Sequence, residues 1–194
     1  ELAGETEALR ELQAQQARLI GKDFQLLPAL ALDPALIDAW YYSGLCYVHT
    51  GNNPASVKAF TRALDLDPRH YDASFEKGLV LSDMGDYKEA VTELSHALDI
   101  DDSKSEAHYA KGLALEALGR YEDALEQYTL ATEADPSWLA PWYLKAYSLT
   151  KLKRYEEALV AVDCALAIDP DDRDSNDLKA GILEYLGRSG EAAK

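Results

Sequence analysis

The chain has 194 residues, of which 47% are hydrophobic, and its formal net charge is −16. This composition predicts a folded protein, and the acidic excess argues against nucleic acid as a partner, because nucleic-acid binders present basic faces. No apolar run approaches the ~18 residues of a membrane-spanning helix, and two cysteines are too few for a disulfide framework or a zinc cluster.

The first residues lack the basic start and the apolar core of a signal peptide. Glu1 stands where an initiator Met would be, so we expect a fragment or a processed form. We expect a cytoplasmic location and no insertion into a membrane.

Three sets of residues recur with a period of 34 positions. They are Pro34, Pro68, Pro136 and Pro170 with Asp102 in the remaining place; Ala29, Ala63, Ala97, Ala131 and Ala165; and Gly44, Gly78, Gly112, Ala146 and Ala180. Within one period, residues 79–98 show two stretches of helical apolar spacing separated by Gly85 and Asp86. Gly85 suits the left-handed position after a helix, and Asp86 with Glu89 suits a capping box.

Each period therefore predicts a helix, a tight turn and a second helix, and the proline ends the pair. The small residues predict close contact between helices. In chain order we expect one domain over 1–194, with a divergent repeat at 3–36, repeats at 37–70, 71–104, 105–138 and 139–172, and a capping helix at 173–187. A single pair cannot bury its apolar face, so neighbouring repeats must complete the core.

This pattern resembles the tetratricopeptide repeat family. Trp40, Gly44, Tyr47, Phe60, Ala63 and Pro68 follow the family's order of Trp, Gly, Tyr, Phe, Ala and Pro. The resemblance is strong over 37–172. It implies an all-α fold, a right-handed superhelical solenoid of about five helix-turn-helix repeats plus a C-terminal capping helix. It also implies a concave side where family members hold peptides.

Residue patterns typical of catalysis are missing from the sequence. The four histidines occupy unrelated places in the repeat, and His108 stands where Trp40 and Trp142 stand, which indicates a packing residue. The acidic segment 169–177 lacks calcium-loop spacing, because Arg173 occupies the third ligand place. We predict no enzymatic activity, no cofactor and no metal.

A column of lysines recurs where the family usually has an apolar residue: Lys77, Lys111, Lys145 and Lys179. They could form a cationic ladder for an acidic chain. The favoured interpretation is that their stems cover apolar surface while the ammonium groups reach water or acidic neighbours.

The candidate binding residues recur on the first helices. Tyr41, Phe75, Tyr109 and Tyr143 are each followed four residues later by Leu45, Leu79, Leu113 and Tyr147. Residues four apart share a helix face, so these eight predict an apolar strip, which the resemblance places on the concave side. Asp38, Asp72, Glu106 and Asp174 stand near the helix starts and would flank it.

These features predict a protein-protein interaction scaffold that binds a peptide segment with apolar anchors and some basic residues. A monomer or a weak homo-oligomer is expected. The alternatives are a self-assembling structural module or an accessory domain of a larger protein.

Overall fold

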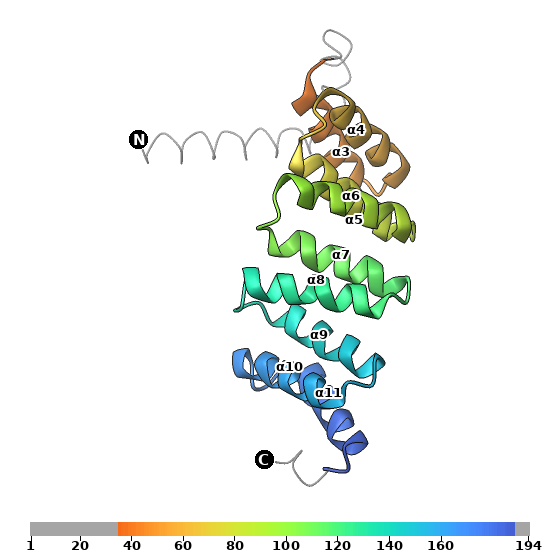
Figure 1. The fold of residues 1–194 in the computed structure, drawn as a ribbon. Coiled ribbons are helices and arrows are strands. Elements are labelled where there is room, and N and C mark those ends of the chain that lie inside the picture. Colours follow the sequence, from red (N-terminus) through yellow and green to blue (C-terminus); the bar gives the residue numbers. More distant parts are fainter. Residues whose placement is uncertain (1–34, 189–194) are drawn as a thin grey trace, which may run out of the picture. The chain divides into compact units, whose positions relative to one another are not determined.

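The computed structural model describes residues 35–188, and these form helices joined by short turns (Figure 1). The divergent repeat expected at 3–36 lies almost wholly outside this range. Contacts group the chain into two compact units, one ending at Gly85 and the other beginning at Asp86.

The first unit contains helices α3 (Ile37–His49), α4 (Asn53–Leu66) and α5 (Tyr71–Asp83). Each packs against its neighbour in the sequence. Phe60 on α4 is fully buried and forms the centre of the core with Ala63, Ala73 and Val80.

The second unit contains α6 (Tyr87–Ile100), α7 (Ser105–Ala117), α8 (Tyr121–Ala134), α9 (Leu139–Lys151), α10 (Tyr155–Ile168) and α11 (Arg173–Tyr185). These helices stack in chain order (Figure 1). The last of them, α11, packs against α10 and contacts α9, and Ile182 of α11 joins the core around Val162. This is the contact expected of a helix that covers the final pair.

The first helices begin at the residues that the repeat predicts: Ile37, Tyr71, Ser105, Leu139 and Arg173. All described elements are helices, and each packs mainly on its sequence neighbours, which confirms the predicted all-α solenoid of helix pairs. Close approach also occurs where a small residue predicted it. A Cβ atom on Gly112 would lie 2.5 Å from the Tyr128 ring, so this pair of helices requires glycine there.

The turn inside each pair was predicted in part. Gly85 has φ of +83°, which confirms the left-handed position. The capping box at Asp86 was wrong, since its carboxylate caps no amide of α6. The backbone at the start of α4 has a similar geometry. There the Asn52 side chain accepts from the Ala55 amide at 3.4 Å, which is at the limit of hydrogen-bond distance.

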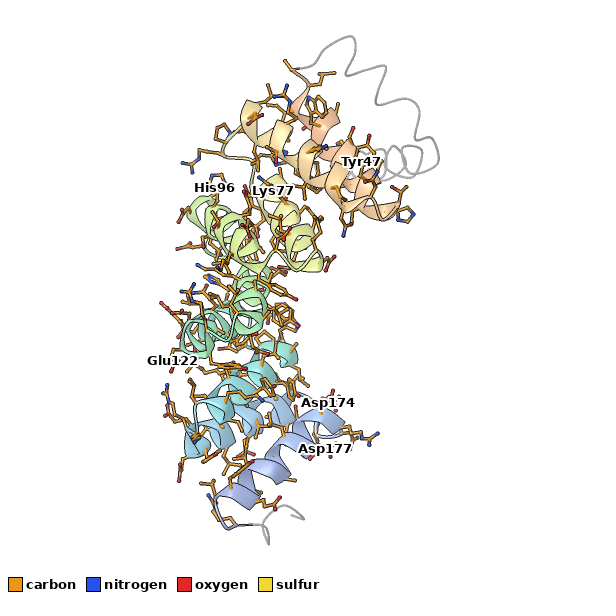
Figure 2. The ribbon with its side chains drawn as sticks, turned by 90° about the vertical axis from the view of Figure 1, so that its right-hand side faces the viewer. Tyr47, Lys77, His96, Glu122, Asp174 and Asp177 are labelled. Carbon is orange, nitrogen blue, oxygen red and sulfur yellow. The ribbon has the colours of Figure 1, made fainter. Side chains whose placement is uncertain are left out.

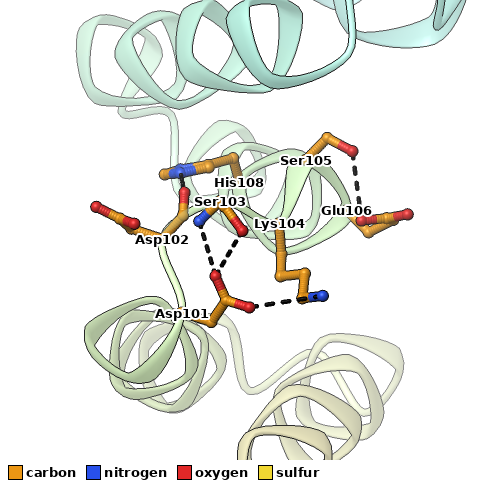
Figure 3. A network of polar contacts seen from close by, with 7 residues as sticks. All are labelled: Asp101, Asp102, Ser103, Lys104, Ser105, Glu106 and His108. Atoms are coloured by element: carbon orange, nitrogen blue, oxygen red, sulfur yellow. Dashed lines mark hydrogen bonds and ion pairs between the residues drawn. The ribbon is translucent and has the colours of Figure 1, made fainter.

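Repeats are joined by a turn that does not depend on proline. α6 ends at Ile100 although Asp102 replaces the proline. The carboxylate of Asp101 accepts a hydrogen bond from the Ser103 amide at 3.1 Å and pairs with Lys104 (Figure 3). The equivalent bonds run to Asp67 from Arg69, to Asp135 from Ser137 and to Asp169 from Asp171. An aspartate turn is thus the shared feature that ends each pair.

Candidate functional site

In the first unit, Tyr41 of α3 lies in an aromatic cluster. Its ring centroid is 5.0 Å from His70 and 6.0 Å from Phe60. Phe75 of α5 stacks on Tyr71, with centroids 5.9 Å apart. Tyr41 and Phe75 are both partly exposed, so each ring combines a packed face with a face open to a partner.

Two carboxylates of α5 act on Tyr41. Burial, followed by the charges of Asp72 and Glu76, raises the Tyr41 pKa well above its usual range. Burial and the neighbouring Asp72 also raise the pKa of Glu76. Neither acid forms an ion pair with a described residue. Glu76 was missed in the sequence, although it lies one helical turn after Asp72 and so on the same face.

In the second unit, the ring centroid of Tyr109 on α7 lies 4.5 Å from that of Trp138 and 6.4 Å from that of Tyr128. Its ring therefore holds α7 against α8 and against the turn before α9. The 34-residue period could not predict this contact, because it places Tyr109 on a helix face but does not show which rings the turn before α9 brings to it.

Glu116 of α7 occupies the space between three helices. Its Oε2 accepts a hydrogen bond from the Tyr128 hydroxyl at 3.2 Å and one from the Ser148 hydroxyl at 3.5 Å. Burial raises the pKa of Glu116, although the two hydroxyls and Lys151 act in the opposite direction. Its charge in turn acts on Tyr109 and Tyr143. This half-buried acid among the predicted aromatic residues had no signal in the 34-residue period.

Tyr143 and Tyr147 lie on α9 beside acids of α11. Burial, followed by the charge of Asp174, raises the Tyr143 pKa, and Tyr147 contributes as well. The Lys151 ammonium lies 4.7 Å from the Tyr147 ring centroid. Asp174 and Asp177 project from α11 on one side of this unit, while Glu122 projects on the other (Figure 2). The structure thus places Asp174 close enough to Tyr143 for its charge to act on that residue.

The remaining predicted residues occupy exposed or intermediate positions. Leu113 is 38% exposed, whereas Leu45 packs against the core around Phe60 and Leu79 is partly buried. Asp38 is exposed and lines a cavity with Tyr42 and His70. Glu106 is exposed and accepts a hydrogen bond from the Ser105 hydroxyl at 3.3 Å (Figure 3).

His108 is a buried packing residue, as predicted. Its Nε2–H donates to the carbonyl oxygen of Asp102 at 2.9 Å, and Nδ1 lies 3.0 Å from the side-chain amide of Gln127. Within residues 35–188, no group of three or more His, Cys, Asp or Glu side chains could hold a metal ion. No helix in the same range is long and apolar enough to cross a membrane.

Two lysines of the predicted column cover neighbouring surface. The Lys179 ammonium lies 2.8 Å from Asp163, and that of Lys145 lies 5.1 Å from the ring centroid of Trp142. These contacts agree with the favoured interpretation of long stems and nearby acids for Lys179. Lys145 covers Trp142 in the same way, but no described acid forms an ion pair with it.

Family models described as tetratricopeptide repeat match residues 25–71, 48–103, 75–138 and 139–172. The chain belongs to the tetratricopeptide repeat family. No curated protein sequence matches it significantly.

Solved tetratricopeptide structures share its fold. YrrB, described as a TPR protein with an unusual peptide-binding site, is 26% identical with a TM-score of 0.76, over 89% of this chain and 87% of YrrB. A crystal structure of MamA is 18% identical with a TM-score of 0.78, over 81% of this chain and 86% of MamA. The MamA RS-1 ArsTM double mutant is 19% identical with a TM-score of 0.76, over 86% of this chain and 96% of the MamA chain. A tetratricopeptide fold with these neighbours supports a scaffold for protein interactions.

Proposed function

We propose that this tetratricopeptide chain binds a peptide segment on its first-helix surface. Each unit carries its own part of this surface: Tyr41, Leu45, Phe75 and Leu79 in the first unit, and Tyr109, Leu113, Tyr143 and Tyr147 in the second. The observation that carries the proposal is the combination of partly exposed rings with nearby carboxylates that form no ion pair with any residue in the described range 35–188, as at Tyr41, Asp72 and Glu76. Exposed apolar residues grouped in this way are typical of binding surfaces.

The ligand would be an extended or helical segment with apolar anchors and basic residues. Its anchors would pack against the open face of Phe75 in the first unit or against Leu113 in the second. Its lysine or arginine side chains would approach Asp72 and Glu76, whose like charges destabilise each other until a cation arrives. Asp38, Glu106 and Asp174 would orient the remaining basic groups. The peptide-binding site of YrrB is consistent with this proposal.

A library of random 12-residue peptides displayed on phage supplies the probe. Synthetic versions of the selected peptides are titrated against the unmodified chain and against Phe75→Ala, Leu113→Ala and the control Glu126→Ala. Truncating Phe75 should weaken binding by roughly thirtyfold, because a central aromatic anchor contributes 2 kcal/mol or more and rim contacts contribute little. Equal affinity of Phe75→Ala, Leu113→Ala and unmodified chain would disprove the surface.

Phe75 and Leu113 are preferred to Tyr109 for this test. The Tyr109 ring packs against Trp138 and Tyr128, so its truncation would also change the folded structure. Circular dichroism before each titration confirms that the variants keep native helicity.

The acidic residues give a separate and kinetic prediction. Neutralising Asp72 and Glu76 as Asp72→Asn and Glu76→Gln should slow association with a basic peptide and reduce its salt dependence, since surface charges steer encounter. Stopped-flow measurement at two salt concentrations tests this. An unchanged association rate at low salt would remove the acids from recognition.

Sedimentation distinguishes the structural alternative. A receptor keeps its mass as protein concentration rises, whereas a self-assembling module grows. The cytoplasmic location stays a prediction, which cell fractionation tests.

A further inference from the structure

A cavity of about 360 Å³ lies between α8, α9 and α10, away from the first-helix surface residues. Apolar side chains form most of its wall: Leu125, Trp142, Leu149, Val160 and Ala161. Val160 of α10 is 66% exposed, so its side chain is open to a partner at this cavity. The proposed peptide site makes no use of these residues.

Lys145 lines this cavity and is partly buried. Its ammonium lies over Trp142, and burial lowers the pKa of Lys145 even though Glu133 and Cys164 act in the opposite direction. No described residue forms an ion pair with it. The other cation of the cavity, Arg154, is already bound to Glu157 through two hydrogen bonds of 2.7 and 2.6 Å.

The next repeat shows what Lys145 lacks. Lys179 stands 34 residues later, at the same place in the repeat, and its ammonium pairs with Asp163 at 2.8 Å. The residue 34 positions before Asp163 is Thr129, which lines the Lys145 cavity. The Thr129 hydroxyl donates to the Leu125 carbonyl at 2.8 Å and brings no negative charge.

The preceding repeat is different again. Lys111 lines a cavity of about 580 Å³ between α6, α7 and α8 that also contains Asp99 and Asp102. Lys111 thus shares its cavity with two aspartates, and Lys179 pairs with Asp163. Lys145 instead lies among apolar side chains, and the one carboxylate that lines its cavity, Glu157, is already bound to Arg154.

We propose that the cavity between α8, α9 and α10 binds a protein segment that presents an aliphatic or aromatic side chain next to a carboxylate. The apolar side chain packs against Trp142 and Val160, and the carboxylate pairs with Lys145 in the position that Asp163 occupies beside Lys179. In a chain of net charge −16, a carboxylate is repelled by most of the surface, so this ammonium and its apolar walls specify where it binds. The site is separate from the first-helix surface and takes a ligand of opposite charge.

The decisive variant is Thr129→Asp, which supplies the missing internal carboxylate without removing any wall of the cavity. Thr61→Asp is its matched control. Thr61 stands at the same place in an earlier repeat, and its hydroxyl makes the equivalent bond, to the Val57 carbonyl at 2.7 Å. Both variants add one negative charge on a second helix, so a general charge effect would appear in both.

Phage displaying random 12-residue peptides are first depleted on Thr129→Asp and then selected on the unmodified chain. The recovered peptides should contain Asp or Glu beside Leu, Ile or Phe. Their synthetic versions should bind at least about tenfold more weakly to Thr129→Asp and to Lys145→Met, because each change removes the charged hydrogen bond between Lys145 and the peptide carboxylate. Replacing the peptide's Asp by Asn should weaken binding similarly, and Thr61→Asp should bind like the unmodified chain.

A readout at the cavity accompanies the affinities. The indole N–H resonance of Trp142, assigned with Trp142→Phe, should shift when the peptide is added to the unmodified chain. Recovered peptides that bind Thr129→Asp as tightly, or that tolerate Asp to Asn, would overturn the proposal, as would a selection that yields no peptide dependent on Lys145. A peptide-free dimer that Lys145→Met abolishes would assign the cavity to a second copy instead.

The two proposals fail separately. Phe75→Ala should leave binding of the acidic peptides unchanged, and Thr129→Asp should leave binding of the basic peptides unchanged.

Discussion

At the scale of single residues, one position of the repeat is occupied by three different side chains that donate the same hydrogen bond. His108, Trp142 and Asn176 donate to the carbonyl oxygens of Asp102, Pro136 and Pro170, at 2.9, 3.1 and 3.0 Å. In each case the acceptor lies six residues earlier, in the turn before the helix. The sequence indicated packing at this place, because the family pattern has Trp there. The property that the three side chains share is an N–H donor, and the sequence does not show it because the three residue types differ.

His108→Phe should therefore lower the free energy of unfolding by about 1–3 kcal/mol, since a partly buried carbonyl loses its donor while the volume is kept. The matched change Trp142→Phe should cost less, because its bond is exposed and water replaces the indole. Urea denaturation measures both. An equal loss of unfolding free energy in the two variants would show that packing, rather than the hydrogen bond, determines the stability contributed at this position.

A second prediction at this scale concerns Glu116 and pH. Burial raises the pKa of Glu116 in the folded chain above its value in the unfolded chain. The folded state therefore binds more protons between the two pKa values, and the contribution of Glu116 to stability decreases as pH rises through that range. Replacing it as Glu116→Gln should remove this loss.

Urea denaturation of Glu116→Gln and the unmodified chain between pH 4 and pH 8 tests the sign. The stability of the variant relative to the unmodified chain should increase as pH rises. A relative stability that decreases toward pH 8 would mean that hydrogen bonds to the charged carboxylate outweigh its burial.

The candidate site was predictable only in part, for reasons visible at single residues. The period identified Tyr109 because aromatic residues recur at its place. It could not reveal that the ring packs on Trp138, which depends on how α8 turns into α9. Glu116 was hard to predict because Val48, Ser82 and Thr150 stand at its place in the other described repeats, and an acid recurs there only in the capping helix, as Glu184. Features that belong to one repeat leave no periodic signal.

At the scale of elements, the repeat placed every described first helix, whereas capping rules misjudged a turn. Helix contact depends on side-chain volume, which sequence shows directly, as at Gly112 and Tyr128. Capping depends on details of the turn that the sequence does not show: Asp86 caps no amide of α6, whereas Asn52 with similar backbone angles reaches the Ala55 amide at 3.4 Å. The fold could thus be predicted from the small and apolar columns, and the local hydrogen bonds could not.

The contact between α7 and α8 leads to a paired prediction. Gly112→Leu should destabilise the chain by about 1–3 kcal/mol, because the new side chain meets the buried Tyr128 ring. Gly181→Ala on α11 is the control. Apart from its chain neighbours and the nearby backbone of its own helix, no atom lies within 4 Å of the added Cβ there. Alanine favours the helix by about 1 kcal/mol over glycine, so this variant should be more stable.

Thermal unfolding of the two variants gives opposite shifts if close packing determines the effect. A midpoint of Gly112→Leu equal to that of the unmodified chain would contradict the assigned contact.

At the scale of the whole molecule, contacts are local along the chain. Within each of the two units, every helix packs against its neighbours in the sequence, and the α9 to α11 contact is the exception among the stronger contacts of the described helices. Stability in such an arrangement is close to a sum over repeats and their interfaces. A disturbance in one pair should therefore decrease with distance along the chain, unlike that in a globular domain with one central core.

Two substitutions test this locality by amide hydrogen exchange. Gly44→Leu drives a side chain into the Phe60 ring and should reduce the protection of α3 and α4. Val162→Ala leaves a cavity in a fully buried position and should reduce the protection of α9 and α10. In native conditions each variant should leave the distant pair with the protection of the unmodified chain, because partial opening costs only the nearest interfaces. If either substitution instead lowers protection equally from α3 to α11, the chain unfolds as one cooperative body. A substitution at the cavity between α8, α9 and α10 would then weaken binding at the first-helix surface simply by destabilising the whole chain.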